Sequence, residues 1–433
     1  MAEDAGYWKR SKRVEEISDK DENRELVLSG WTSNLRNLKS ISFIRLRDGE
    51  KDIQITCKSD ETRALSKKIT PESVIAVRGL LNKNESVDGN YEIIAEKIKI
   101  LNLAKAPLLL DVSGKVKADF DTRFDSRFMD LRNPRNIAIF RIKSKAITII
   151  RDECLSQGFV EVHTPKIIAT ATEGGTQLFP VQYFEKRCYL GQSPQLYKEI
   201  LMSSGFDRVF EIAPAFRAEE HNTPRHINEF MSIDIEASFL DHEDVMKILE
   251  NLMKKLFDGI NREPNLKILN YELPEVKLPL ERITYEKCIK IAREKGVKIE
   301  YEEDISTEAL KTIAEDLPPL YFITQWPSSI KPFYAQPFEH KPEITKSFDL
   351  MSGSLELASG AQRVHDPVLL KKRIVEKNLK VEDFVFYTKA FEYGMPPHSG
   401  WAIGAERLTS ILTGIENIKE CTLFPRDRRR VIP

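Results

Sequence analysis

FRAEEHNTPRHINEF, residues 216–230, has the pattern of two strands joined by a polar loop. The first strand is the apolar run RVFEIAPAF, which ends at Phe216, and Glu229-Phe230 opens the second run, MSIDIEASF. Because apolar runs bounded by polar clusters read as strands, Arg217 and Glu219 are expected to project at a strand end. They lie beside a polar, cationic loop.

These residue types suit a nucleotide. A guanidinium such as that of Arg217 holds a phosphate through paired donors, a carboxylate such as that of Glu219 accepts from an adenine amino group, and Phe230 offers a stacking face. An Arg two residues before a Glu on a strand is, however, more often a surface ion pair. This stretch alone leaves both interpretations open.

A second candidate phosphate site is GWAIGAERL, residues 400–408. Its glycines allow close approach of the backbone, and a helix that begins after them would carry Arg407 in its first turn. A lone glycine-rich helix start is weak evidence, because an ordinary helix N-terminus has the same pattern.

The first hundred residues alternate in short β-rich runs separated by Gly30, Asp48-Gly49 and Asp88-Gly89. This pattern predicts five strands, with room for a short helix at 58–71, and is typical of an OB-fold barrel, although another small barrel fits equally well. The predicted strands are 26–31, 41–47, 52–57, 73–81 and 91–101.

The remainder predicts a larger α+β domain behind a connector. Residues 111–135 carry heavy mixed charge and no periodicity, whereas the segment from 136 has an apolar helical stripe that ends near Gly158. Apolar strands at 188–192, 208–216 and 231–239 then interleave with helices at 242–261 and 366–378. We therefore divide the chain into a barrel (1–105), a linker (106–135) and a second domain (136–433) with a small insertion at about 263–345.

Composition sets the broad class. At 433 residues, with 41% hydrophobic and 31% charged residues, the chain is expected to form a soluble enzyme of two or three domains. A net charge of -1 gives no overall basic field, so nucleic-acid binding would need local patches. The five scattered cysteines favour neither disulfides nor zinc, and no apolar leader or membrane span is visible. A cytoplasmic location is expected.

Together, these motifs resemble those of class II aminoacyl-tRNA synthetases. A helix ending in FVEVHTPK with Pro165 comes first, FRAEE follows, and GAERL comes last. The barrel points to the aspartyl, asparaginyl and lysyl subgroup. Four further blocks are similar to the archaeal and eukaryal type of aspartyl-tRNA synthetase: QSPQLYK (192–198), SFDLMSGSLELASGAQRVHD (347–366), YGMPPHSGWAIGAERL (393–408) and FPRDRRRVIP (424–433).

The resemblance implies an α+β multidomain protein: an OB-fold barrel that binds the anticodon and an antiparallel catalytic sheet flanked by helices. It also implies a homodimer that uses the helix of 136–157 and Pro165, although the apolar stripe of that helix fits a buried core equally well.

The resemblance further implies an ATP site with Mg²⁺. Its catalytic residues would be Arg217, Glu219 and Arg407. The ATP-binding residues would be Arg217, Glu219, Arg225, His226, Phe230, Glu356, Gly404 and Arg407. Asp349, Glu356 and Ser359 would hold the metal, a spacing that suits Mg²⁺ because this ion takes few carboxylates and binds bridging phosphate oxygens.

An aspartate pocket follows in the same way, with Lys198 and Arg363 facing the side-chain carboxylate. An uncharged asparagine would leave these cations unpaired, which can reject it by roughly 10⁴-fold. The implied aspartate-binding residues are Glu173, Ser193, Gln195, Lys198, Asp234, Ser359 and Arg363. The loop ATEGGT, residues 171–176, resembles the lid over this pocket, although an ordinary surface turn has the same composition.

On the barrel, the resemblance assigns the anticodon to Arg36, Phe43 and Gln54. Phe43 would stack on a base, and strand alternation puts it on one face with Ile41 and Arg45. The family usually has RDLG where this chain has Arg36-Asn37-Leu38-Lys39, so the finer contacts stay open.

The expected activity is formation of aspartyl-adenylate from L-aspartate and ATP, followed by transfer to the 3′ end of tRNA(Asp). Three alternatives stay open: an enzyme that also charges tRNA(Asn) for later amidation, a non-catalytic paralogue, and an amide-forming relative. No chemistry is predicted for 263–345, and the arginines at 426 and 428–430 suit acceptor-stem phosphate or a solvated terminal charge run.

Overall fold

The computed structural model describes residues 7–170 and 177–432, and divides the chain into two compact units, Met1–Asp119 and Phe120–Pro433. Each unit is described by itself. Loop 171–176, including Glu173, lies outside the described residues. No helix among the described residues is long and apolar enough to cross a membrane.

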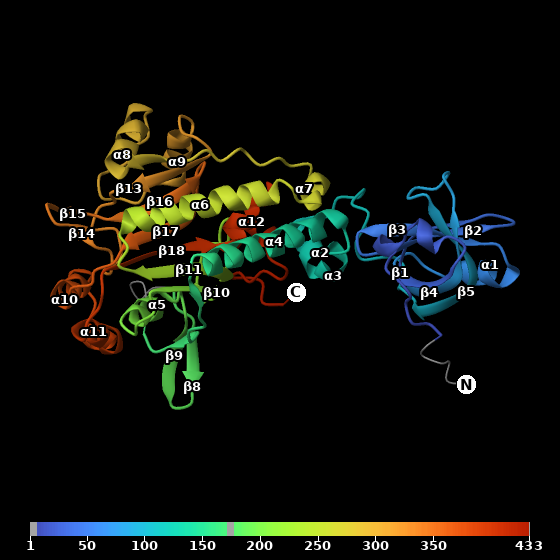
Figure 1. Ribbon diagram of the computed structural model, residues 1–433, viewed down its shortest axis with the longest axis horizontal. Coiled ribbons are helices and arrows are strands. Elements are labelled where there is room, and N and C mark those ends of the chain that lie inside the picture. The colour runs from blue at the N-terminus through green and yellow to red at the C-terminus, as the bar shows by residue number, and fades with distance from the viewer. Residues whose placement is uncertain (1–6, 171–176, 433) are drawn as a thin grey trace. The chain divides into compact units, whose positions relative to one another are not determined.

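The first unit is a closed barrel with strand order β1-β2-β3-β5-β4 (Figure 1). Its elements are β1 (Glu25–Asn37), β2 (Ser42–Asp48), β3 (Lys51–Cys57), α1 (Asp60–Ser66), β4 (Val74–Lys83) and β5 (Tyr91–Asn102), preceded by 3-10 turns Val14–Glu16 and Asp19–Asp21. Alternation sends Ile44 and Leu46 into the core and leaves Phe43 half-exposed. The predicted OB-fold barrel and its five strands are confirmed.

The second unit is built on an eight-stranded sheet of order β12-β13-β16-β17-β18-β11-β10-β6. The strands are β6 (Val160–Glu161), β10 (Arg208–Phe216), β11 (Glu229–Ser238), β12 (Glu281–Thr284), β13 (Leu320–Thr324), β16 (Ser347–Ser352), β17 (Leu355–Gln362) and β18 (His398–Gly404). The pairs β12–β13 and β10–β6 are parallel and the others antiparallel, which confirms the predicted fold class.

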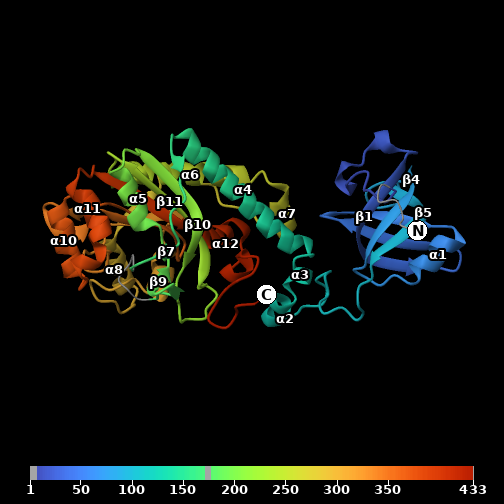
Figure 2. The same ribbon diagram turned by 90° about the horizontal axis from the view of Figure 1, so that it is seen from below.

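Long helices cover one face of this sheet (Figures 1 and 2). They are α4 (Pro134–Ser156), α6 (His242–Ile260) and α12 (Ala405–Thr413), whose apolar side chains share one core with the central strands. Asn133 caps α4 and Pro134 occupies its first turn, while Gly158 beyond its end has φ +79°. The predicted stripe of Ile139, Ile142, Ala146 and Ile150 is buried against the sheet.

Smaller elements border the sheet. The other helices are α5 (Gln195–Met202), α7 (Pro264–Leu269), α8 (Tyr285–Glu294), α9 (Thr307–Ala314), α10 (Pro367–Glu376) and α11 (Val385–Glu392), with 3-10 turns Val381–Phe384 and Ile418–Cys421. A three-stranded sheet contains β7 (Ile167–Ile168), β8 (Pro180–Tyr183) and β9 (Lys186–Leu190), and a hairpin contains β14 (Pro337–Phe338) and β15 (Lys341–Thr345).

The predicted linker is only partly a connector. Its second half forms α2 (Phe120–Asp125) and α3 (Arg127–Asp130) within the second unit. Buried Arg127 donates from Nε to the Leu423 carbonyl oxygen at 3.0 Å, and Arg430 Nη1 lies 2.6 Å from Asp125 Oδ1. These polar contacts tie the segment to the C-terminal part of the chain, a long-range pairing that local composition does not encode.

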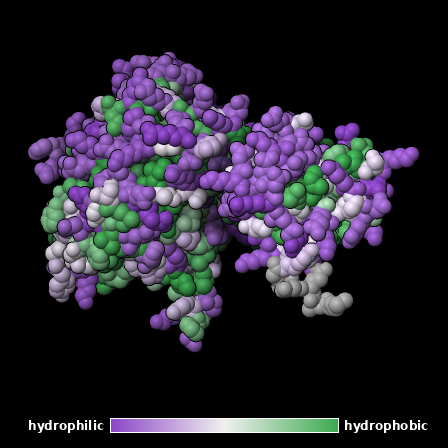
Figure 3. All heavy atoms as spheres, turned by 45° about the vertical axis from the view of Figure 1, so that its right-hand side comes forward, coloured by the Kyte–Doolittle hydropathy of each residue, from purple (hydrophilic) through white to green (hydrophobic). Residues whose placement is uncertain are grey.

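The insertion is likewise part of the main sheet, because β12 and β13 extend its edge. Helices α8 and α9 pack on these strands around Tyr285, Tyr321 and Trp326, which form a separate apolar core. The visible surface of the molecule is largely hydrophilic, with scattered apolar patches (Figure 3).

Candidate active site

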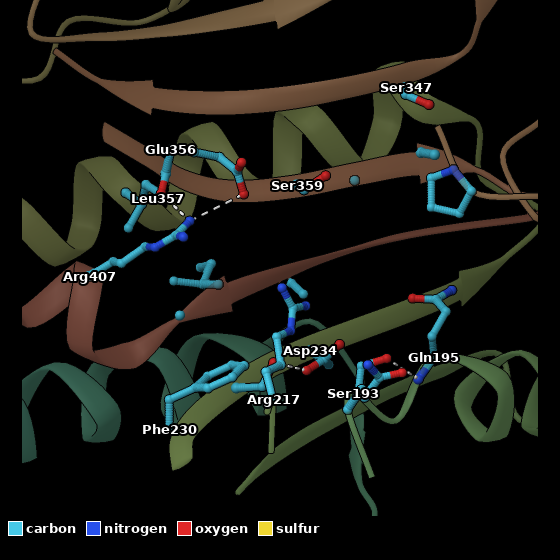
Figure 4. Close-up of a pocket in the computed structure, with 18 of the residues that line it drawn as sticks. Ser193, Gln195, Arg217, Phe230, Asp234, Ser347, Glu356, Leu357, Ser359 and Arg407 are labelled. Atoms are coloured by element: carbon cyan, nitrogen blue, oxygen red, sulfur yellow. Dashed lines mark hydrogen bonds and ion pairs between the residues drawn. The ribbon is translucent and has the colours of Figure 1, made fainter. Parts of the chain in front are cut away.

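A cavity of about 440 Å³ lies against the central strands of the second unit (Figure 4). It brings together residues from segments that are far apart in the sequence. The predicted residues that line it are Ser193, Gln195, Arg217, Glu219, Arg225, His226, Phe230, Asp234, Glu356, Ser359, Arg363, Gly404 and Arg407. Lys198 and Asp349 are not among the described residues that line it.

Strand register explains the convergence. Asp234, Ala402, Ser359 and Asp349 are successive cross-strand partners on β11, β18, β17 and β16. Directly paired residues share one face of a sheet, so Asp234, Ala402 and Ser359 line the cavity, and Asp349 continues the row behind its wall. A parallel row two residues further along contains Glu236 and Gly400.

Gly400 has a steric role in that second row. A Cβ at this position would run into the Ile235 carbonyl oxygen and the Glu236 carboxylate. Only glycine therefore lets the Glu236 side chain lie across β18. Gly404, in contrast, precedes α12, and a Cβ there would make only ordinary contact with the Arg407 side chain at 3.8 Å, so no steric clash requires glycine at this position.

One end of the cavity is cationic and aromatic. The Arg217 guanidinium carbon lies 5.6 Å from the centre of the Phe230 ring. In Figure 4, Arg407 and Glu356 face this pair across the cavity, and Arg407 Nη1 donates to the Glu356 carbonyl oxygen at 3.0 Å. Two guanidinium groups and an aromatic face are thus available to a polyphosphate and a planar base.

The loop between β10 and β11 is held by its own polar contacts. Asn228 Nδ2 donates to the carbonyl oxygens of Arg217 at 2.7 Å and Glu219 at 3.1 Å. His226 Nδ1 lies 2.6 Å from Thr223 Oγ1, and burial holds the pKa of His226 below its ordinary value. His226 is therefore expected to be neutral near pH 7, leaving Arg225 as the charged group of this turn.

The other end of the cavity contains a buried charge network. Arg363 donates from Nε and Nη2 to the Glu236 carboxylate at 3.0 and 3.2 Å, and its guanidinium carbon lies 5.5 Å from the Tyr334 ring centre. Burial works to lower the pKa of Arg363, but the charges of Glu236 and Glu199 outweigh it and raise the pKa. Arg363 is a permanent cation in the cavity wall.

Lys198 lies one layer deeper. Its Nζ donates to Asp234 Oδ1 at 3.1 Å and the Ile235 carbonyl oxygen at 3.2 Å, and lies 3.4 Å from Glu236 Oε2. With 2% of its side chain exposed, Lys198 is separated from the cavity by the carboxylates that it binds. In this structure the lysine therefore holds Asp234 and Glu236, while Arg363 reaches the cavity.

Asp349 also lies behind the wall and is 3% exposed. Lys331 Nζ donates to its Oδ2 at 2.7 Å, whereas Oδ1 is buried without a hydrogen-bond partner among the described residues. Burial raises the pKa of Asp349, although the Lys331 charge opposes this. The described part of the chain contains no group of three or more His, Cys, Asp or Glu side chains that is arranged to hold a metal ion by itself. An orphaned carboxylate oxygen near Ser359 and Glu356 nevertheless fits a hard cation that takes its other ligands from phosphate.

On the barrel, strand pairing brings the three predicted anticodon residues to one area. Arg36 on β1 faces Phe43 on β2, and Phe43 faces Thr56 on β3. Gln54 Nε2 donates to Thr56 Oγ1 at 3.3 Å and to Glu92 Oε2 at 3.1 Å. Arg36 is exposed and Phe43 is half-buried, so an aromatic and a cation share the outer surface.

Sequence reasoning missed several groups of the site. Glu236, Tyr334, Lys331 and Glu199 take part in it or line it, yet none belongs to a recognisable motif. Glu236 could have been found from alternation, because it lies two residues after Asp234 on the same strand face. Tyr334 and Lys331 lie in the segment 263–345, for which no chemistry was predicted.

The fold and the site define a class II tRNA synthetase. Residues 119–428 match the family of tRNA synthetases class II (D, K and N), and residues 26–101 match the OB-fold nucleic acid binding domain. The chain belongs to this synthetase family.

Relatives that match along nearly the whole chain lead to the aspartate–tRNA ligases within it. The chain is 51% identical to the aspartate–tRNA(Asp/Asn) ligase of Archaeoglobus fulgidus, over 96% of this chain and 99% of that one. It is also 51% identical to the aspartate–tRNA(Asp) ligase of Thermoplasma acidophilum, over 97% and 99%. Among solved structures it resembles asparaginyl-tRNA synthetase from Pyrococcus horikoshii with asparaginyl-adenylate, at 29% identity and TM-score 0.92 over 98% and 99% of the two chains.

Proposed function

We propose that this protein activates L-aspartate with ATP and transfers it to the 3′ end of tRNA(Asp). The observation that carries the proposal is a single cavity with Arg217 and Arg407 at one end and Arg363 at the other. The first end suits the phosphates of ATP, and the second suits the side-chain carboxylate of aspartate.

Both chemical steps proceed without an enzyme nucleophile. An oxygen of the aspartate α-carboxylate bonds to the α-phosphorus of ATP as the bond to the β-phosphate oxygen breaks, releasing pyrophosphate. A terminal ribose hydroxyl of the tRNA then attacks the carbonyl carbon, and AMP leaves. Such chemistry depends on positioning and charge stabilisation, to which Arg217 and Arg407 contribute.

Within the nucleotide end, Arg217 is placed at the α-phosphate, Phe230 and Glu219 at adenine, and Arg407 at the γ-phosphate or the adenine face. The cation–aromatic contact between Arg217 and Phe230 supports this assignment, since it holds both groups at one strand end. Arg225, His226, Glu356 and Gly404 complete the nucleotide end.

Within the amino-acid end, Arg363 binds the side-chain carboxylate, and Gln195, Ser193 and Asp234 receive the ammonium. Lys198 acts through the carboxylates that it holds. Ser359 borders this end, and Glu173 remains part of the expected lid.

Mg²⁺ would be held by Asp349, Glu356 and Ser359. Bound there, it would neutralise charge on the ATP phosphates, as two protein carboxylates leave coordination positions for phosphate oxygens.

On the barrel, Arg36, Phe43 and Gln54 would contact the tRNA anticodon. Base stacking on Phe43 needs no particular hydrogen-bond pattern, so sequence readout falls to groups such as Gln54. We place this enzyme of protein synthesis in the cytoplasm.

A homodimer would use α4 and the segment through Pro165. Strand β6 ends the main sheet, and Val160 on it is 47% exposed. Leu155 and Ile167 nearby in sequence are 50% and 45% exposed, and Pro165 is exposed too. An uncovered sheet edge with apolar neighbours supports association with a second copy.

Aspartate-dependent exchange of labelled pyrophosphate into ATP tests the activation step. We expect exchange with L-aspartate and at least about a hundredfold less with L-asparagine, since the latter leaves Arg363 unpaired. Absence of exchange in folded protein would favour a non-catalytic paralogue, and release of free asparagine with ammonia as co-substrate would favour an amide-forming relative.

The relatives named for both tRNA(Asp) and tRNA(Asn) favour a second candidate, an enzyme that also aspartylates tRNA(Asn). Charging assays with each purified tRNA separate the two. Equal charging supports the broader activity, and charging of tRNA(Asp) alone supports the stricter one.

A further inference from the structure

Glu199, on the first turns of α5, lies behind the amino-acid end of the cavity and is fully buried. Its two carboxylate oxygens have separate partners. Oε1 accepts from Gln195 Nε2 at 2.6 Å. Oε2 accepts from the Tyr387 hydroxyl at 2.6 Å and faces His398 Nε2 at 3.3 Å.

His398 supplies the charge that a buried carboxylate needs. Its Nδ1 lies 2.8 Å from the Pro396 carbonyl oxygen, which can only accept, so Nδ1 carries a proton. Nε2 faces Glu199 Oε2; burial works to raise the pKa of Glu199, but the hydrogen bond and the charge of His398 outweigh it and lower this pKa. The two residues therefore form an imidazolium–carboxylate pair, which keeps Glu199 ionised in spite of its burial.

An ionised Glu199 fixes the orientation of the Gln195 amide. The amide has one donor end and one acceptor end, and an acceptor-only partner selects the NH₂ end. Gln195 lines the cavity, and Figure 4 shows its side chain pointing into it. Its Oε1 has no hydrogen-bond partner among the described residues, so this acceptor is available on the cavity side.

We propose that Glu199 is a positioning residue for substrate recognition, which holds the amide of Gln195 so that its carbonyl oxygen accepts from the ammonium of L-aspartate. The inference rests on the proposed function and deepens it. Without the hydrogen bond to Glu199, the Gln195 side-chain amide can adopt the flipped orientation. Its NH₂ group would then face and repel the ammonium.

The substitution Glu199→Gln replaces one of the two carboxylate oxygens with an NH₂ group, and the two oxygens have different hydrogen-bond partners. The Tyr387 hydroxyl, which donates to Oε2 at 2.6 Å, keeps the carbonyl oxygen of the introduced amide at the former Oε2 position. The introduced NH₂ group then faces Gln195 and donates to its carbonyl oxygen. The Gln195 amide is therefore flipped, and its own NH₂ group points into the cavity. Volume and shape barely change, so the variant tests hydrogen-bond polarity rather than packing.

A double-mutant cycle with Gln195→Ala tests the proposal in the intact protein, using aspartate-dependent pyrophosphate exchange. We expect E199Q to lower kcat/KM for aspartate by about tenfold to a hundredfold through KM, as for a hydrogen bond to a charged group. KM for ATP should change little, whereas the melting temperature should fall, because His398 loses its buried counter-charge. In the Q195A background the same substitution should alter kcat/KM less than about threefold.

Two results overturn the proposal: an unchanged kcat/KM in E199Q, or an equal loss in the presence and absence of Gln195. A rise in both KM values would also overturn it, because that indicates a general structural role. Wild-type protein without exchange would instead contradict the proposed function, which keeps the two failures distinct.

Discussion

Arg363 is held by Glu236, and this pairing sets both the orientation of the guanidinium and the loss of stability expected when Arg363 is replaced. The bidentate contact orients the guanidinium, and Lys198 lies 3.4 Å from the same carboxylate. An oriented cation loses little entropy on binding a second anion. The proposed preference for aspartate thus depends on a carboxylate that the ligand never touches.

Replacing Arg363 with leucine should abolish aspartate activation. Two charge-assisted hydrogen bonds of about 1.5–3 kcal/mol each are removed, so exchange should fall by at least about a hundredfold. The variant should also lose about 3–5 kcal/mol of folding stability, because Glu236 remains buried with only Lys198 beside it.

The double variant Arg363→Leu/Glu236→Gln is the matched control. It should recover most of the melting temperature while exchange stays lost. Wild-type exchange kinetics in either variant would refute the assignment of Arg363.

Asp349 provides a second prediction. Asn at this position keeps the shape but removes the charge, so the Mg²⁺ concentration for half-maximal exchange should rise by at least about tenfold. Lys331→Ala is the control: it retains the carboxylate and removes a competing cation, so its Mg²⁺ requirement should not increase. A D349N variant with an unaltered Mg²⁺ titration would exclude this metal site.

Single elements fix which face each side chain presents. On β2, alternation buries Ile44 and Leu46 and turns Phe43 outward, where Arg36 is its cross-strand neighbour. On β11, the same alternation presents Asp234 and Glu236 to one side. A shift of one residue in the register of either strand would move each of its side chains to the opposite face of the sheet. Burial of the apolar face therefore also fixes which side chains lie on the functional face.

Phe43→Ala should weaken tRNA binding by roughly 5- to 150-fold, the equivalent of about 1–3 kcal/mol for one stacked base. Pyrophosphate exchange should be unaffected, because its residues all lie in the second unit. Leu80→Ala serves as control: Leu80 is 44% exposed on β4, which does not pair with β2. Equal binding losses in the two variants would argue against stacking on Phe43.

At the scale of the whole molecule, activation and anticodon binding fall into different units, and the sheet of the second unit ends in an open strand, β6. Such an edge is usually covered in a stable protein. A second copy, related by twofold symmetry, would cover it and the exposed apolar side chains next to it.

Val160→Asp should therefore convert a wild-type dimer into monomers in sedimentation velocity without unfolding the chain. Val385→Asp is matched in chemistry and exposure, 54% against 47%, but lies on α11, and it should stay dimeric. Monomeric wild-type protein, or a dimeric V160D variant, would contradict the proposed interface.

The local sequence pattern predicts the barrel, the helix of 136–157 and the order of the arginine motifs, because strand alternation, helical stripes and glycine positions are local properties. Arg217, Phe230 and Arg407, which the sequence pattern singled out, line one cavity. Residues 120–125 and 127–130, which the pattern assigned to a linker, form α2 and α3 of the second unit, because their contacts come from the distant C-terminal segment.

Which charged side chains reach the cavity depends on long-range packing. Lys198 and Arg363 were expected to face one anion together, yet buried carboxylates share these two cations, and only Arg363 lines the wall. The row through Asp234, Ser359 and Asp349, and the pairing of Glu199 with Gln195, arise from strand register and helix docking. These depend on contacts between segments far apart in the chain, for which no local pattern exists.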